Sequence, residues 1–561
     1  MRKASRRFTV LLMFAVSTPA AEEPRLLSAF PYGAQPGGET VVTVRGTALK
    51  DAHAVWVAGA FAEARVLGTE EDSAAPPEGK PAAHLARIEF KVASGTAPGS
   101  YAFRMVTPRG VTNPLAFRVV NEPTLVEPAR LDRFPVAVFG RIRSKGDINE
   151  YSFDVAAGEE LRFDVSAGNS AFDPAVTIFE PAGSWFDASR LKRIAYQDEP
   201  LSFPGLSKDT HLTHKFAKGG RHVLRVEAFQ GTGGPDFVYC LRVGKPGGAG
   251  QGPEPDIDWA ERTFTRSIPS NWISRLNARA GEEKASPVLE TYRAVEDGSS
   301  SIPEMKLPGV VEGVIGRAGL IQKIRFRAEA AQEVAIEVET PRDTMPVFNP
   351  VVRVLDAQGK ETVTNIYTKR NNNGLYMMKM IEPKTTVGLP AAGEYTVEIR
   401  NLTPDHGAES FAYRVCLRPR VPHLGQAKIA DTAVNLAPGE SKPVAITIDR
   451  EEGYPGLVTI EAEGLPAGVR AVVGSAFDPP KPPLPNGGKL ERYNPETQRS
   501  TLVFSASADA APTPMPVFAR VVVRPVHQGK IGPVAAERVI PIMVVANIGD
   551  IARKETPPAT R

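Results

Sequence analysis

A long internal repeat constrains the fold of this chain more than any other feature. GGRHVLRVEAF and AGEYTVEIRNL carry apolar residues at matching alternate positions, and Gly220 in the first lies 173 residues before Gly393 in the second. The same offset relates EYSFDVAAGEELRFDV, from Glu150, to KIRFRAEAAQEVAIEV, from Lys323. Alternation with a period of two is typical of strands, so the repeat predicts two copies of one β-sandwich.

Length and composition agree with several such units. A chain of 561 residues is too long for one core and predicts about four domains. Its 49 glycines and 51 prolines are dispersed, which suits many turns between short strands. The formal net charge of +3 indicates neither a nucleic-acid partner nor an anionic membrane surface. We therefore expect an all-β protein of tandem β-sandwiches, both Ig-like and jelly-roll.

The N-terminus has the pattern of an export signal. Four basic residues are followed by an apolar run from Phe8 to Val16 and by small residues from Ser17 to Ala21. Residues 1–21 are therefore predicted to be a signal peptide, and the mature chain to be periplasmic or secreted. Arg6-Arg7 leaves a twin-arginine signal open as the alternative export route. The next longest apolar run is broken by Pro541 and is too short to span a bilayer.

The repeated motifs resemble a known family. The order G-x-I, G-D, Y-x-F, D-P-x-V-x-I, G-x-x-x-x-V and Y-x-L is similar to the bacterial pre-peptidase C-terminal domain, in residues 123–246 and again in 301–421. The resemblance implies a small jelly-roll sandwich that accompanies secreted proteins and peptidases. The second copy has Leu320 and Asn349 where the first has Asp147 and Asp173. A cation site that uses these carboxylates is therefore not expected in the second copy.

Two further sandwiches are predicted to flank the repeat. Residues 24–120 contain FPYGAQPGGETVVTVRGTAL and resemble the IPT/TIG immunoglobulin-like domain, with Gly46 and Leu49 in its G-x-x-L. Residues 422–549 contain the turn GLPAGV at Gly464 and resemble the Ig-like repeats of bacterial surface proteins. A Pro-rich insertion from Phe477 to Gln498 interrupts the latter, and residues 550–561 are predicted to be a disordered tail.

Residues 247–300 are predicted to be a connector with two short helices. Ser270 or Asn271 is a candidate cap for the first helix. The second would begin at Ser286-Pro287, with Tyr292 and Val295 on one face. Trp259 and Trp272 are expected to dock on a neighbouring sandwich.

No motif for catalysis is present in the sequence. HExxH and G-x-S-x-G are both missing, and the D-T-H at Asp209 lacks the glycine that follows a subtilase aspartate. Because the β units and the connector occupy nearly all of the mature chain, we expect no enzymatic activity. We expect no catalytic residue, no cofactor and no metal ligand.

Three groups of residues nevertheless have a functional reading beside a structural one. His211 and His214 have H-x-x-H spacing, but on a strand their rings would lie on opposite faces. Carboxylates of the first copy are possible calcium ligands, but aspartate is also favoured in turns: Asp147, Asp173, Asp198 and Asp236. Clustered aromatics of the first copy would form a sugar- or peptide-stacking platform or plug the end of the core: Trp185, Phe186, Tyr196 and Phe203. The structural reading is preferred for each group.

The two cysteines lie in similar phrases, FVYCLRV and FAYRVCL. Alternation places Cys240 and Cys416 on the face opposite Tyr239 and Tyr413, each on the last strand of its own sandwich. A disulfide would require these strands from separate domains to approach within about 7 Å, so two separate thiols are predicted.

These features predict a non-catalytic secreted binding or scaffolding protein. Its expected partner is a polysaccharide, a peptide or another protein of the cell envelope or exterior. The alternative is an accessory or targeting subunit of a separate secreted hydrolase or peptidase.

Overall fold

The structure is a computed structural model that describes most of the chain. The described residues are 23–73, 82–168, 172–181, 191–198, 210–246, 289–329, 332–340, 348–370, 377–382, 384–420, 422–429, 433–452, 454, 456–476, 489–492, 499–527 and 529–546. The predicted signal peptide, the predicted helix with Ser270 or Asn271 as its cap, both connector tryptophans and the predicted tail lie outside them. Among the described residues, the one helical element is the short η1 (Ala58–Ala60), and no helix is long and apolar enough to cross a membrane.

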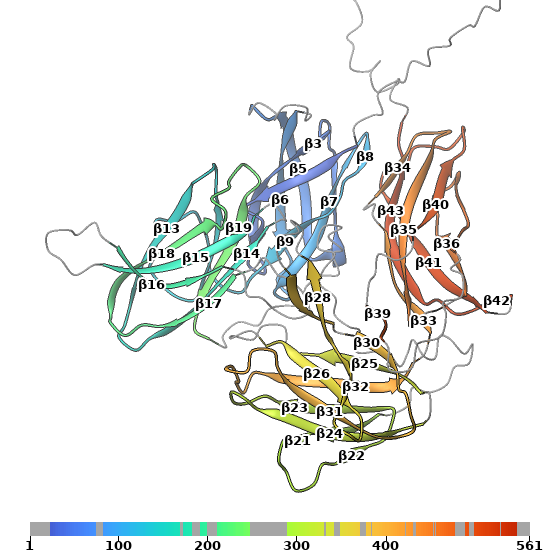
Figure 1. Ribbon diagram of the computed structural model, residues 1–561. Coiled ribbons are helices and arrows are strands. Elements are labelled where there is room, and N and C mark those ends of the chain that lie inside the picture. The colour runs from blue at the N-terminus through green and yellow to red at the C-terminus, as the bar shows by residue number, and fades with distance from the viewer. Residues whose placement is uncertain are drawn as a thin grey trace, which may run out of the picture.

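The strands pair into β-sandwiches that follow one another along the sequence, which confirms the all-β prediction; in space the N-terminal sandwich lies between the first repeat and the C-terminal sandwich (Figure 1). In the N-terminal sandwich one sheet contains, in order, β1 (Arg25–Phe30), β3 (Glu39–Thr47), β6 (Ala83–Val92) and β5 (Ala62–Glu71). The facing sheet contains β2 (Gly33–Ala34), β9 (Leu115–Val119), β7 (Gly99–Thr107) and β4 (Ala54–Val57), with β8 (Gly110–Val111) paired to β7.

The first repeat follows with two five-stranded sheets. One contains β10 (Thr124–Val126), β12 (Val136–Arg141), β19 (Val238–Gly244), β14 (Glu160–Ala167) and β17 (Thr210–Lys215). The other contains β11 (Arg130–Leu131), β13 (Ile148–Val155), β18 (Gly220–Ala228), β15 (Pro174–Pro181) and β16 (Leu191–Gln197).

The second repeat keeps the order of the central strands in both sheets and has further strands at their edges. One contains β20 (Glu290–Arg293), β23 (Gly309–Val314), β32 (Ala412–Pro419), β25 (Glu333–Glu339), β30 (Lys384–Gly388) and β39 (Lys489–Arg492). The other contains β21 (Val295–Glu296), β24 (Ile321–Ala328), β31 (Gly393–Asn401), β26 (Pro350–Leu355) and β27 (Glu361–Thr364), with β22 (Glu304–Met305) on β24. A separate hairpin joins β28 (Ile366–Arg370) to β29 (Met377–Ile381).

The C-terminal sandwich completes the described chain. One sheet contains β33 (His423–Ile429), β35 (Ser441–Glu451), β40 (Arg499–Ala506) and β37 (Val469–Val472). The other contains β34 (Val434–Leu436), β43 (Ala536–Val544), β41 (Val517–His527), β36 (Leu457–Glu463) and β38 (Gly474–Ala476), with β42 (Lys530–Ile531) on β41. The insertion predicted within this unit contributes β39, which pairs with β30 of the second repeat.

The predicted second helix of the connector is wrong in its described part. Residues Glu290–Arg293 and Val295–Glu296 are strands, and β20 pairs in parallel with β23. The first repeat has an equivalent strand, because Thr124 of β10 lies beside Ala137 as Thr291 lies beside Val310. The link between paired strands is longer in the second copy, so comparison at a fixed offset did not find this strand. Pairing with a neighbour outweighed the local capping signal.

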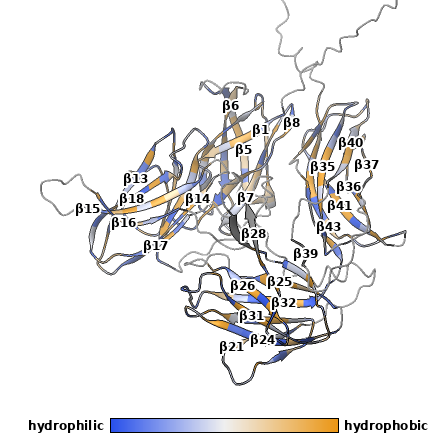
Figure 2. Ribbon diagram, viewed as in Figure 1, coloured by the Kyte–Doolittle hydropathy of each residue, from blue (hydrophilic) through white to orange (hydrophobic). Residues whose placement is uncertain are grey.

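Each sandwich buries alternate residues between its sheets, as the alternation of apolar and polar residues along the strands shows (Figure 2). In the first repeat Tyr239, Leu241 and Val243 of β19 are buried in the core between the two sheets. The outer face of the same strand is also buried, because it packs on the N-terminal sandwich. Ala137, Phe139, Val238 and Cys240 belong to the core of that sandwich. The two sandwiches are therefore held together by shared apolar packing and not by the linker alone.

Candidate functional site

The candidate calcium ligands of the first repeat are used in structural contacts. Asp236 accepts hydrogen bonds from Ser28 Oγ at 2.6 Å and Arg45 Nη1 at 2.7 Å, both in the N-terminal sandwich. The carboxylate of Asp147 accepts the backbone N–H groups of Arg143 and Ile148, so it stabilises a turn as the structural reading predicted.

The other two candidate calcium ligands are Asp173 and Asp198. Asp173 precedes β15, and its carbonyl accepts the N–H of Phe229 at 2.8 Å. Asp198 follows β16 and lies 3.5 Å from the hydroxyl of Tyr196. Within the described residues, no group of three or more His, Cys, Asp or Glu side chains is arranged to hold a metal ion. In the second repeat Leu320 belongs to the apolar core.

The two histidines lie on opposite faces of a strand, as their spacing on β17 predicted. His211 Nδ1 is 2.7 Å from Asp164 Oδ1 on the neighbouring strand β14. Burial opposes ionisation of Asp164, but His211 and Arg162 hold the pKa of this carboxyl below its ordinary value. His214 packs edge-on against Phe216, and burial lowers its pKa. An H-x-x-H metal pair is therefore not formed.

Of the clustered aromatics, only Tyr196 lies among the described residues. It is 40% exposed, and the guanidinium of Arg193 lies 5.6 Å from its ring centroid. Trp185, Phe186 and Phe203 lie outside the described residues, so the stacking platform stays a hypothesis.

Both cysteines are buried and form no disulfide, which confirms the prediction of two separate thiols. Cys240 packs into the N-terminal sandwich, whereas Cys416 packs beside Val310 and Leu289. Burial raises the pKa of the Cys416 thiol well above its ordinary value.

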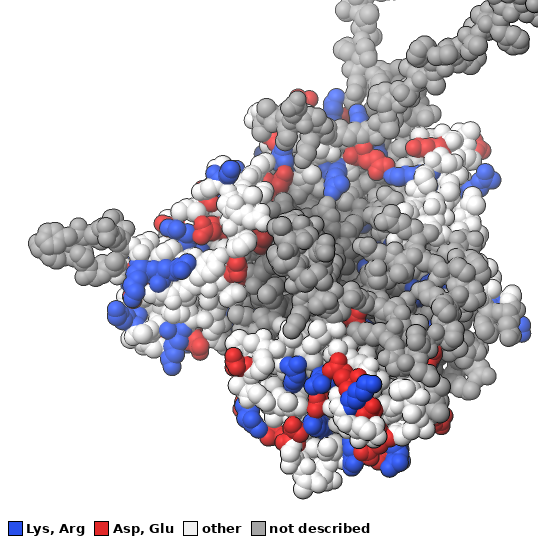
Figure 3. Space-filling view, in the orientation of Figure 1, with Lys and Arg blue, Asp and Glu red and all other residues white. Residues whose placement is uncertain are grey.

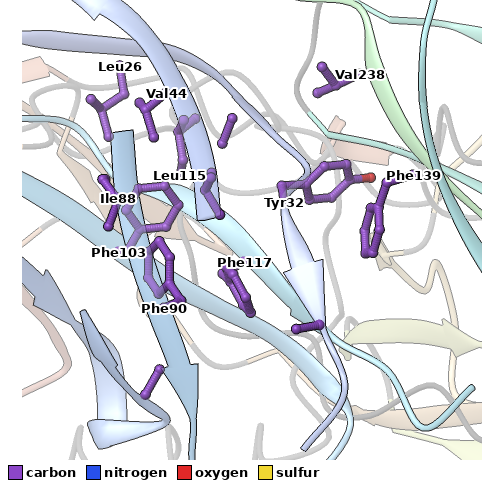
Figure 4. Close-up of a cluster of buried hydrophobic side chains, with 14 of the residues drawn as sticks. Leu26, Tyr32, Val44, Ile88, Phe90, Phe103, Leu115, Phe117, Phe139 and Val238 are labelled. Atoms are coloured by element: carbon purple, nitrogen blue, oxygen red, sulfur yellow. The ribbon is translucent and has the colours of Figure 1, made fainter. Parts of the chain in front are cut away.

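The contact between the N-terminal sandwich and the first repeat combines apolar and polar groups, and Figure 4 shows Tyr32, Phe139 and Val238 in its apolar part. The rings of Tyr32 and Phe139 meet edge to face with centroids 5.3 Å apart. The hydroxyl of Tyr32 donates to the carbonyl of Ser166 at 2.9 Å. Arg141 places its guanidinium 4.0 Å from the centroid of Phe30. These contacts fix one sandwich on the other at several points.

The second repeat uses the same sheet face, but with charged groups. We define the inter-domain ion cluster by its members, Glu337, Lys384, Arg418, His423 and Glu452. Glu337, Lys384 and Arg418 lie on β25, β30 and β32 of the second repeat. His423 and Glu452 belong to the C-terminal sandwich, and all five side chains are buried.

Short contacts hold this cluster together. Arg418 donates to Glu337 Oε1 at 2.6 Å and to Glu452 Oε2 at 2.8 Å. Lys384 Nζ lies 2.7 Å from Glu452 Oε1, and His423 Nδ1 lies 3.8 Å from the same oxygen. Burial opposes ionisation of Glu452, but the charges of Lys384 and Arg418 lower its pKa to about 2.

Sequence comparison did not identify this cluster. With Tyr239 and Tyr413 aligned, Arg418 takes the place of Gly244 in the first copy. This arginine in place of glycine was the signal that could have revealed the cluster. A long cationic side chain on the last strand of one copy alone indicates a neighbouring domain that the other copy lacks. The partner Glu452 lies in another domain, which alternation within one sandwich cannot reveal.

Comparisons with known proteins identify no family for this chain. No protein-family model matches the chain, and no curated protein matches it. Among solved structures, the pre-peptidase C-terminal domain of a collagenase from Bacillus anthracis is 15% identical, covers 22% of this chain and 98% of its own length, and has a TM-score of 0.16.

Two larger structures align along most of the chain. Tripeptidyl peptidase 2 is 8% identical over 95% of this chain and 41% of its own, with a TM-score of 0.13. The surface layer protein SbsC, domains 1–6, is 10% identical over 94% of this chain and 55% of its own, with a TM-score of 0.15. At such TM-scores the likenesses carry no argument, so the fold assignment depends on the strand pairing described above.

Proposed function

We propose that this chain is a non-catalytic, extracytoplasmic scaffold that presents a fixed series of β-sandwiches to a polysaccharide, a peptide or another envelope protein. The observation that carries the proposal is the use of polar and charged side chains between sandwiches. Asp236, a candidate ligand, binds Arg45 of the neighbouring sandwich, and Arg418 binds Glu452 of another. Groups that could serve chemistry or cation binding are used here to fix domains relative to one another.

The surface charge supports a neutral or mixed partner rather than a strongly charged one. Lys and Arg are interspersed with Asp and Glu over the face in view, most densely on the second repeat (Figure 3). Ion pairs such as Arg353–Glu361 and Arg327–Glu304 join charges across its strands. A scaffold that meets a neutral polysaccharide or a mixed protein surface needs no single-sign patch.

Retention on cell-envelope material tests the proposal. Purified chain is incubated with insoluble polysaccharide and, separately, with a native envelope extract, and bound material is recovered by sedimentation or affinity capture. Saturable retention on polysaccharide, or capture of one envelope protein at fixed stoichiometry, supports the scaffold. Co-purification with a hydrolase would favour the accessory-subunit alternative. Turnover of a glycan or peptide substrate by the purified chain alone would contradict the non-catalytic proposal.

A further inference from the structure

The N-terminal and C-terminal sandwiches, the two ends of the described chain, contact one another. β8 of the first lies beside β34 of the last (Figure 1). Buried apolar residues from both sandwiches form one cluster: Val106, Val111, Ala433 and Met543. Trp56 adds a ring contact with Phe518, with centroids 4.7 Å apart. We call residues 23–246 the N-terminal half and residues 289–546 the C-terminal half. The surface between them that is formed by β4, β8, β34, β41 and β43 is the half–half interface.

Asn435 is a buried polar residue of this interface. Its Oδ1 accepts the backbone N–H of Val111 at 2.9 Å, and its Nδ2 donates to the carbonyl of Val111 at 3.0 Å. One side chain thus satisfies both polar groups of a buried residue, as a neighbouring strand would. The flanking Val434 and Leu436 face the core of their own sandwich, so the amide of Asn435 is directed outward to its partner.

Gly110 is the steric complement of Asn435. Its φ of 121° lies in a region that other residues rarely adopt. A Cβ at this position would lie 2.2 Å from Cγ of Asn435, well inside van der Waals contact. The backbone of β8 can approach the amide closely because no side chain stands between them. Hydrogen-bond pattern and shape therefore both select this pairing.

Within the described residues, each half of the chain forms its own sheets. Among the described residues, no sheet contains strands from both 23–246 and 289–546. The N-terminal half contains two sandwiches with a shared core, and the C-terminal half contains two sandwiches joined by the ion cluster. The half–half interface therefore contributes side-chain contacts and adds no strand to a sheet of either half.

We propose that the half–half interface is a self-sufficient recognition surface, through which the N-terminal half binds the C-terminal half as a partner protein. A chain cut between the halves then remains a one-to-one complex. This inference does not depend on the proposed scaffold function, because it concerns only contacts within the chain.

A cleavable full-length chain tests the proposal. A protease recognition site is inserted between residues 247 and 288, the chain is cut, and its mass is followed by analytical ultracentrifugation during dilution. The uncleaved chain gives the reference mass. We expect the cut halves to sediment as one species at micromolar concentration.

Two variants on opposite halves give the sharp test. Asn435→Ala leaves the buried N–H and carbonyl of Val111 without this partner, and Gly110→Ala introduces the clash, so each should weaken association roughly tenfold or more. Gly37→Ala is the matched control, since its φ is also positive at 73° but its Cβ would meet only Ser94 at an ordinary 3.6 Å. It should leave association unchanged.

Thermal unfolding of each separated half shows whether a variant has lost its own fold. A variant that has done so is discarded, and the variant on the other half decides. Separation of the unmodified halves at micromolar concentration would overturn the proposal. Unchanged association in a correctly folded Asn435→Ala or Gly110→Ala protein would overturn it as well.

Discussion

Glu452 shows how strongly one residue can depend on its neighbours. Its backbone is left-handed, with a φ of 55°, which a residue with a side chain adopts at a cost of about 1 kcal/mol. Its side chain is buried among Lys384, Arg418 and His423. A buried carboxylate is stable only when it is paired and hydrogen-bonded, and both conditions are met here.

Glu452→Gln should destabilise the protein by about 3–5 kcal/mol, because it leaves two buried cations with less compensation. Urea denaturation followed by far-ultraviolet circular dichroism, which reports on all the strands, measures the change in free energy of unfolding. Glu463→Gln is the control, since Glu463 pairs with Arg520 and Arg524 at the surface and should change stability by less than about 1 kcal/mol. Equal effects of both changes would contradict the role assigned to the ion cluster.

The lowered pKa of Glu452 predicts that acid destabilises the protein. The pKa of Glu452 is lowered from 4.5 to about 2 in the folded protein. The stability that it contributes is therefore fully present above about pH 4.5 and is lost as pH falls toward 2. Denaturation curves between pH 7 and pH 2 should show a loss of stability that is smaller in Glu452→Gln. A variant with the same acid dependence as the unmodified chain would argue against this assignment.

The two thiols should be inaccessible in the native protein. Cys240 is fully buried between two sandwiches, and Cys416 is 7% exposed with a raised pKa. Reaction with a thiol reagent should be slow in the native state and reach two equivalents per chain after denaturation without reductant. Zero equivalents in a monomer would reveal a disulfide and refute the arrangement of separate strands.

At the scale of elements, the two repeats preserve a close contact between two strands. Gly140 of β12 lies opposite Tyr239 of β19, and Gly313 of β23 lies opposite Tyr413 of β32. A Cβ on Gly140 would lie 2.4 Å from Cζ of Tyr239, and one on Gly313 would lie 2.3 Å from the hydroxyl oxygen of Tyr413. Each glycine leaves room for a tyrosine ring to cross the strand.

Gly140→Ala and Gly313→Ala should each destabilise the protein by about 1–3 kcal/mol through overpacking. Gly244→Ala is the control on β19, since its Cβ would come no closer than 3.4 Å to Pro135. Thermal melting of the three variants measures the difference. A Gly140→Ala protein as stable as the control would show that the tyrosine moves aside without cost.

At the scale of the whole molecule, the two repeats use one sheet face to hold a neighbour, but with different chemistry. The first buries mainly apolar groups against the N-terminal sandwich, with polar contacts such as Tyr32 to Ser166, and the second buries charges against the C-terminal one. The two copies present the same sheet face, and the residues at its alternate positions differ between them. The first repeat is therefore more dependent on its neighbour than a free module would be.

Residues 123–246 alone should be less stable and more prone to aggregate than residues 23–246. Removal of the N-terminal sandwich exposes the apolar outer face that includes Phe139 and Val238. Melting temperature and gel filtration of the two fragments measure the difference. Phe139→Ser in the short fragment should improve its solubility if that face is the cause. Equal melting temperatures and no aggregation of either fragment would contradict the shared core.

The sequence by itself determined what depends on local periodicity. Alternation revealed the strands, the all-β class, the duplication and the opposite faces of Cys240 and Tyr239, because side chains on a strand alternate whatever surrounds it. Alternation also predicted that His211 and His214 lie on opposite faces of one strand. Tertiary structure alone decided which outer faces are covered. Three features depend on segments that are distant in the sequence: the ion cluster, the strand at Glu290–Arg293 and the pairing of Asn435 with Val111. Their stability comes from burial between these segments, which the sequence of one strand does not reveal.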